Sequence, residues 1–201
     1  MRNLLNIILT LITLISFGQN KNPKELGIGL TIATNSYEFE TKLSPNNLYT
    51  NKELTQKWNT SNVFPFFYKP DYGLYHFICL EQTKDYYKIL VNDTTVGYLS
   101  NDSTFYFKTW EVMLLQSTVE RLSNDNPIRK ECNNQSEIII NKCEFDRLEV
   151  IDVIQNDGEF WIQINFSSDC EDHQENNPNV KSGWLKWRTQ EKLLVNFLLL
   201  C

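Results

Sequence analysis

Short runs of alternating apolar and polar residues recur along this chain, a pattern typical of β-strands. Tyr37–Glu40 and Phe160–Phe166 alternate in this way. Leu74–Leu80 is almost continuously apolar and has the length expected of a buried strand. Glu137–Ile140 and Leu148–Ile154 predict two more strands.

Turn residues separate several of these runs. Asn92–Thr95 lies between Tyr86–Val91 and Val96–Leu99, and its side chains can hydrogen-bond their own backbone, which predicts a hairpin. Asp157-Gly158 is a strong cue for a second hairpin. Strands at short spacing with turns between them predict an all-β protein, built as small barrels or a sandwich.

The apolar stretch Phe105–Leu115 fits two patterns. Its first residues, Phe105–Phe107, alternate as in a strand, whereas the spacing of Trp110, Met113 and Leu114 fits a short helix. Both interpretations are open from the sequence.

A change of composition and a weak repeat divide the chain. Ser123–Pro127 is polar and ends in proline, as a linker does, which separates a first lobe (19–122) from a second (123–201). In each lobe an aromatic strand is followed by a glycine, an aromatic residue and a leucine, at Gly97–Leu99 and at Gly183–Leu185. We therefore predict two related lobes.

The first 18 residues are typical of a signal peptide. A basic start at Arg2 precedes the apolar stretch Leu4–Phe17, and Ser16-Phe17-Gly18 fits a cleavage site. The apolar stretch is shorter than the roughly 20 residues of a membrane span, and no second apolar segment in the sequence is long enough. We expect a secreted or periplasmic protein without membrane insertion after cleavage; an uncleaved N-terminal anchor is the alternative.

Four segments of the second lobe resemble successive elements of the bacterial SH3-like domain family. They are Asn126–Arg129, Ser136–Ile139, Trp161–Ile164 and Gly183–Leu185, so the resemblance covers about residues 126–200. The first half resembles the same pattern as a divergent copy. The resemblance implies two small SH3-like β-barrel lobes in tandem, which here follow the predicted signal peptide. The whole chain is also similar to secreted proteins of the Bacteroidetes group, whose leaders often end in Phe-Gly-Gln.

The net charge of the chain limits the classes of partner that it can bind. The formal net charge of −6 argues against a nucleic-acid partner.

In an exported protein, cysteines can pair. The sequence holds five of them, and Cys79, inside an apolar run, is expected to be a buried free thiol. The possible disulfide cysteines are Cys132, Cys143, Cys170 and Cys201, in no assigned pairing, with a reduced and buried set as the alternative.

Candidate catalytic and metal groups are sparse. Cys170 superficially resembles the nucleophile of a cell-wall cysteine hydrolase, but the only histidine after it, His173, lies three residues on in the same loop. His76 and Cys79 should face opposite sides of one strand. The acidic segment 169–175 lacks the ligand pattern of a calcium loop and is expected to be solvated. We predict no catalytic set, no metal and no cofactor.

Aromatic residues offer the best candidate for binding. Phe64–Tyr72 packs five aromatic residues and two prolines into nine positions. SH3-type barrels bind extended peptides on such rings; alternatively, the rings fill the contact between the two lobes. Trp184 and Trp187 should face opposite sides of a strand, so at least one is expected in the core. The candidate binding residues are Phe66, Phe67, Tyr68, Tyr72, Trp184 and Trp187.

These features predict an exported, non-enzymatic binding or structural module of the cell envelope, with a peptide, a cell-wall stem, a glycan or a protein as its partner. Two other functions are open: a cell-wall cysteine hydrolase that uses Cys170 or the acidic loop, and an inhibitor or immunity-type protein.

Overall fold

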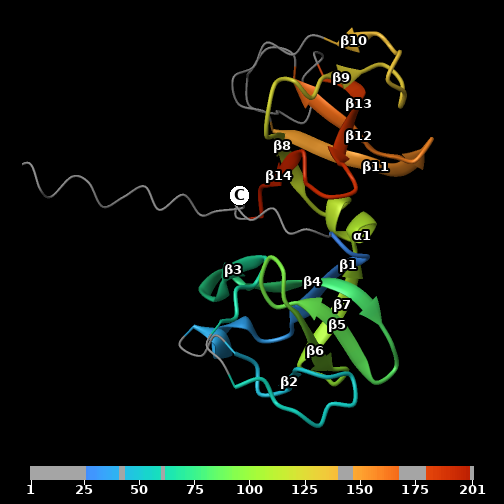
Figure 1. Cartoon of the computed structure of the whole chain (residues 1–201). Coiled ribbons are helices and arrows are strands. Elements are labelled where there is room, and N and C mark those ends of the chain that lie inside the picture. The colour runs from blue at the N-terminus through green and yellow to red at the C-terminus, as the bar shows by residue number, and fades with distance from the viewer. Residues whose placement is uncertain (1–25, 41–43, 60–61, 140–146, 168–179, 200–201) are drawn as a thin grey trace, which may run out of the picture.

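The chain folds into two antiparallel β-sheets, which confirms the predicted all-β class. The computed structural model describes residues 26–40, 44–59, 62–139, 147–167 and 180–199. Figure 1 shows one lobe for each sheet, with the short helix α1 (Trp110–Leu114) between them. One sheet is curled into a half-barrel. No helix in these ranges is long and apolar enough to cross a membrane.

The first sheet contains seven strands and occupies the first lobe. Its strands are β1 (Gly29–Ala33), β2 (Leu48–Tyr49), β3 (Phe67–Lys69), β4 (Leu74–Gln82), β5 (Tyr86–Leu90), β6 (Val96–Ser100) and β7 (Phe105–Thr109). Their spatial order is β2-β6-β5-β4-β1-β7, and β3 pairs with β4. Two single-turn helices, η2 (Ser36–Phe39) and η3 (Pro70–Tyr72), contact each other beside this sheet.

The second sheet also contains seven strands. They are β8 (Thr118–Arg121), β9 (Ile128–Arg129), β10 (Ile138–Ile139), β11 (Leu148–Asn156), β12 (Glu159–Ser167), β13 (Val180–Arg188) and β14 (Val195–Phe197). Their spatial order is β10-β9-β13-β12-β11-β8-β14. Ser123–Pro127, predicted to link the lobes, connects β8 and β9 within this sheet.

Strand β4 is buried on both faces, which explains its continuous apolar sequence. Tyr75, Phe77 and Cys79 belong to a buried cluster made only of first-lobe residues. Ile78, on the opposite face, belongs to a larger cluster that continues into the second lobe. The second lobe therefore covers the face of the first sheet that its own lobe leaves open.

Trp110 is at the centre of this larger cluster, which we call the junction core. Its ring lies 6.0 Å from Phe66, 5.6 Å from Trp187 and 6.0 Å from Phe197, measured between ring centroids. Its indole Nε1 donates a hydrogen bond of 2.7 Å to the carbonyl of Leu26. One aromatic side chain thus joins the start of the first lobe to the end of the second.

Both predicted hairpins are confirmed. β5 pairs with β6, and the side-chain oxygen of Asn92 accepts hydrogen bonds from the backbone N–H groups of Thr94 and Thr95 in the turn between them. β11 pairs with β12 across Asp157 and Gly158, which both have positive φ. Turn chemistry was therefore a reliable guide to these connections.

The structure corrects the strand predicted at Tyr37–Glu40 and resolves the two interpretations of Phe105–Leu115. Tyr37–Glu40, predicted as a strand, instead contains the end of the single helical turn η2, which buries Ser36 and Phe39, three positions apart. Phe105–Leu115 holds both predicted elements in succession, β7 and then α1. The hydroxyl of Thr109 caps α1 by accepting from Val112 N, which starts the helix where the strand ends.

Candidate functional site

The aromatic segment predicted for binding divides between the interior and the surface. Phe66 and Phe67 are buried in the junction core, where the Phe67 ring lies 5.8 Å from the Phe197 ring. Their burial matches the alternative in which these rings fill the contact between the lobes.

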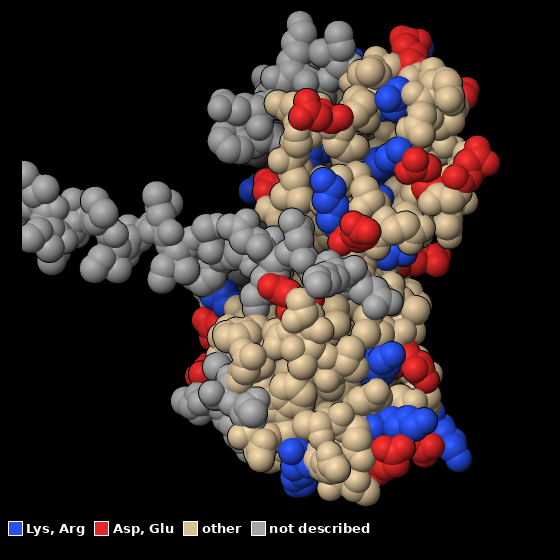
Figure 2. Space-filling view, viewed as in Figure 1, with Lys and Arg blue, Asp and Glu red and all other residues tan. Residues whose placement is uncertain are grey.

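Tyr68 and Tyr72 remain on the surface, 41% and 60% exposed. The Tyr68 hydroxyl donates to the carbonyl of Phe39 at 3.1 Å, which ties β3 to η2. The Lys69 ammonium lies 4.1 Å from the centre of the Tyr72 ring, a cation–π contact. These tyrosines form an exposed edge of the first lobe. In the view of Figure 2, the middle of the first lobe shows no lysine, arginine, aspartate or glutamate.

Trp184 and Trp187 differ in burial, as their spacing on one strand predicted. Trp187 is 3% exposed and belongs to the junction core, whereas Trp184 is half-buried. Of the six candidate binding residues, the surface therefore holds Tyr68 and Tyr72 and part of Trp184.

The histidine and the cysteine on β4 do not form a reactive pair. Cys79 is a buried free thiol, as predicted, and burial raises its pKa, which favours the unreactive thiol. His76 lies on the junction-core side of the strand, where its ring meets Phe67 edge to face at 5.7 Å. Opposite faces of β4 keep these two groups apart.

Burial of His76 makes the fold sensitive to acid. Desolvation lowers the pKa of His76 from 6.5 to about 4, and its Nδ1 has no hydrogen-bond partner among the described residues. The unfolded chain therefore takes up a proton at a higher pH than the folded protein. As pH falls from 6.5 towards 4, we expect a loss of up to about 3 kcal/mol of folding free energy from this group.

Urea unfolding at pH 7.5 and pH 4.5 measures this effect, with His76→Gln as the matched variant, since a glutamine side chain does not titrate. The variant should lose less stability than the native protein between the two pH values. Equal losses would show that His76 does not carry the acid sensitivity.

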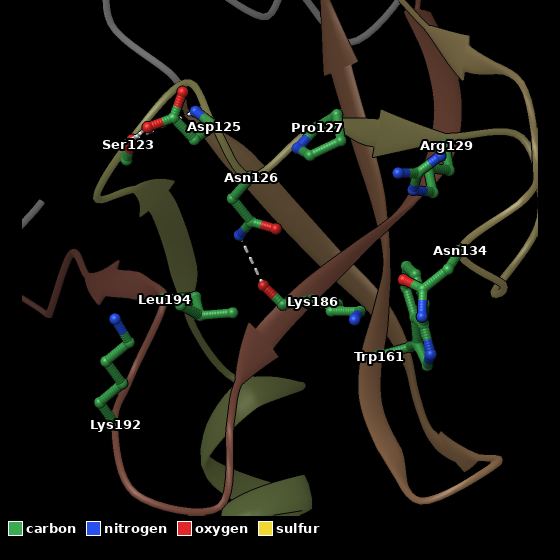
Figure 3. Close-up of a pocket in the computed structure, with 10 residues that line it drawn as sticks. All are labelled: Ser123, Asp125, Asn126, Pro127, Arg129, Asn134, Trp161, Lys186, Lys192 and Leu194. Atoms are coloured by element: carbon green, nitrogen blue, oxygen red, sulfur yellow. Dashed lines mark hydrogen bonds between the residues drawn. The ribbon is translucent and has the colours of Figure 1, made fainter.

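A hollow of about 390 Å³ lies on the second lobe, and Figure 3 shows the ten residues that line it. We call it the basic hollow; it is lined by Ser123, Asp125, Asn126, Pro127, Arg129, Asn134, Trp161, Lys186, Lys192 and Leu194.

The hollow lies where strands β9 and β13 stop pairing and diverge. The two strands pair only between Arg129 and Trp184. Beyond that point the side-chain amide of Asn126 donates to the carbonyl of Lys186 at 2.8 Å and replaces a strand partner, as the dashed line in Figure 3 shows. The loop before it is shaped by the Ser123 hydroxyl, which accepts from Asp125 N at 3.1 Å.

Two of its three cationic groups are held in place by neighbours. The Arg129 guanidinium donates to the carbonyl of Ser136 at 2.8 Å. The Lys186 ammonium lies 2.8 Å from a Glu159 carboxylate oxygen and 5.3 Å from the centre of the Trp161 ring. The hydrogen bond from Lys186 lowers the pKa of Glu159, so this carboxylate stays ionised.

Lys192 is the third cation, and it is exposed at the rim. No ion pair within the described ranges involves its ammonium. Asp125 supplies the hollow's own negative charge. On a chain with a net charge of −6, this small area has more positive than negative groups, which suits a ligand that carries carboxylates.

Sequence reasoning did not identify the basic hollow. Its residues come from four separate segments, and the segment 123–127 was interpreted as a linker because of its polar composition. A usable signal was the asparagine and aspartate content of that loop, since such side chains often hydrogen-bond backbone groups.

Several predicted features lie outside the described residues: the signal peptide, the acidic segment 169–175, and Cys143, Cys170 and Cys201. Cys132 is described and is a half-buried free thiol. Within the described ranges, no cluster of three or more histidine, cysteine or acidic residues could hold a metal ion. Comparisons with family models, curated proteins and solved structures gave no match for this chain.

Proposed function

We propose that the protein is an exported, non-enzymatic binding module with two SH3-like lobes, and that its basic hollow holds a short peptide with free carboxylates, such as a cell-wall stem peptide. The observation that carries the proposal is the excess of cationic groups in this hollow on an acidic chain.

The pairing of strands supports two related lobes. In Gly97–Leu99 and in Gly183–Leu185 the glycine and leucine are buried and the aromatic residue between them is half-buried. Ile89 lies opposite the first glycine and Ile164 opposite the second. A two-residue strand pairs with the other side of each triplet's strand, β2 in one lobe and β9 in the other.

The chemistry of the hollow supports the choice of ligand. Charge-assisted hydrogen bonds from arginine and lysine to carboxylates are stronger than neutral ones. Arg129 and Lys186 are already oriented by Ser136 and Glu159, so less side-chain freedom is lost when a ligand binds. The amides of Asn126 and Asn134 add donors and acceptors for peptide groups.

Isothermal titration calorimetry with a synthetic stem peptide tests the proposal. We expect binding that weakens as salt rises to about 0.5 M, because exposed charges are then screened. Lys192→Gln should reduce the affinity about fivefold, the effect of about 1 kcal/mol for an exposed ionic contact.

Lys84→Gln is the matched control, because Lys84 is an exposed lysine on the first lobe. It should bind the peptide as the native protein does. A peptide whose carboxyl groups are amidated should bind weakly. The proposal fails if the amidated peptide binds equally well or if the two lysine variants behave alike.

A further inference from the structure

A second depression, on the side of the molecule where the lobes meet, combines apolar walls with unpaired donors. We call it the junction groove; it has a volume of about 360 Å³, and its lining includes Ile28, Trp110, Val153, Phe160, Trp187 and Arg188. Both lobes and α1 contribute to it, and it shares no lining residue with the basic hollow.

An irregularity in strand pairing places two polar side chains at this groove. Phe160 pairs with Arg188 and Trp161 with Lys186, so Trp187 is the extra residue of a β-bulge. Adjacent residues on a regular strand face opposite sides, but a bulge re-aims them. The Arg188 guanidinium accordingly lies on the same side as the Trp187 ring, 4.9 Å from its centre.

Both of these side chains have a buried donor without an acceptor. Among the described residues, neither Trp187 Nε1 nor Arg188 Nε has a hydrogen-bond partner, and Trp187 is 97% buried. A buried donor without an acceptor destabilises the fold, because it has lost its hydrogen bonds to water. Two such donors, on adjacent residues that both line this groove, indicate a site whose acceptor is supplied by a ligand.

The surroundings of the Arg188 guanidinium are suited to binding an anion. Its guanidinium carbon lies over the Phe160 ring, 3.9 Å from the ring centre, and no described residue accepts a hydrogen bond from its Nε. Burial lowers the pKa of Arg188, because desolvation disfavours the charged guanidinium. None of the ion pairs in the described part of the chain includes it.

From this geometry we propose that the junction groove binds a small organic monocarboxylate with an aromatic or branched aliphatic body. The carboxylate accepts from Arg188 and from Trp187 Nε1, and the apolar body lies against Ile28 and Val153. Glu111, a carboxylate in the groove lining, disfavours a ligand with more than one negative charge. Because the two orphaned nitrogen atoms are buried, the Arg188 side chain shifts to admit the ligand.

A ¹H–¹⁵N NMR titration of the purified protein with 3-phenylpropionate tests this site. The indole N–H signal of Trp187, assigned by its loss in Trp187→Phe, should shift and saturate at millimolar concentrations, as expected for a ligand of this size. The uncharged 3-phenylpropionamide should bind at least tenfold more weakly.

Arg188→Lys keeps the charge but removes Nε and the planar fork, so it should weaken binding about tenfold. Lys192→Gln, in the basic hollow, should leave this binding unchanged, which separates the two sites. The proposal is overturned if the Trp187 signal does not move, if acid and amide bind equally, or if Arg188→Lys has no effect.

Discussion

Replacing Trp110 with alanine is expected to lower the free energy of unfolding by about 3–5 kcal/mol, the usual cost of deleting a large buried aromatic side chain. Trp110 is 4% exposed and contacts rings from both lobes. The substitution also removes the hydrogen bond from its indole to the Leu26 carbonyl. It should therefore weaken the cohesion of the whole molecule, and urea unfolding monitored by circular dichroism measures the loss.

Val112→Ala provides the control on the same short helix, because Val112 is 40% exposed. Its cost should stay within about 0.5 kcal/mol, as for most surface substitutions. A loss below about 1.5 kcal/mol for Trp110→Ala would contradict a junction core that depends on this ring.

Gly27→Ala is expected to have the second largest effect, about 3–4 kcal/mol, from a left-handed backbone and a steric overlap together. Gly27 has φ +57°, and a Cβ atom there would lie 2.1 Å from the carbonyl oxygen of Cys79. That same carbonyl accepts the hydrogen bond from Ile28 N that leads the chain into β1. The backbone therefore has to move just before β1 begins.

Gly73→Ala separates the two causes. Gly73 has φ +81°, but nothing lies within 4 Å of the position of an added Cβ. It should cost only the conformational part, about 1–2 kcal/mol. If both alanine variants unfold at the same urea concentration, the close approach at Gly27 does not matter for stability.

Local patterns predicted much of the fold because they report directly on burial and turn geometry. Leu74–Leu80 became β4, and Asp157-Gly158 became a hairpin turn. β1 was missed although it lies between β4 and β7. All five of its residues are buried, and its small glycine and alanine residues show neither alternation nor a strong apolar run.

The candidate sites were harder to predict because they depend on contacts between distant segments. Phe66 and Tyr68 stand two positions apart in one aromatic run, yet the first is buried in the junction core and the second is exposed. The Phe66 ring packs against Trp110 of α1, a contact between distant segments that the local pattern does not show. The bulge that brings Trp187 and Arg188 together likewise depends on the register of β12 and β13, which no local pattern states.

We propose that the basic hollow binds a carboxylate-bearing peptide without transforming it. A ¹H–¹⁵N NMR map of the backbone during titration with the stem peptide, followed by mass spectrometry of the recovered peptide, tests both halves of that claim at once. We expect shifts concentrated at residues 123–129, at Lys186 and at Lys192–Leu194, and we expect the peptide to be recovered intact. A cleaved peptide, or shifts confined to other parts of the chain, would contradict it.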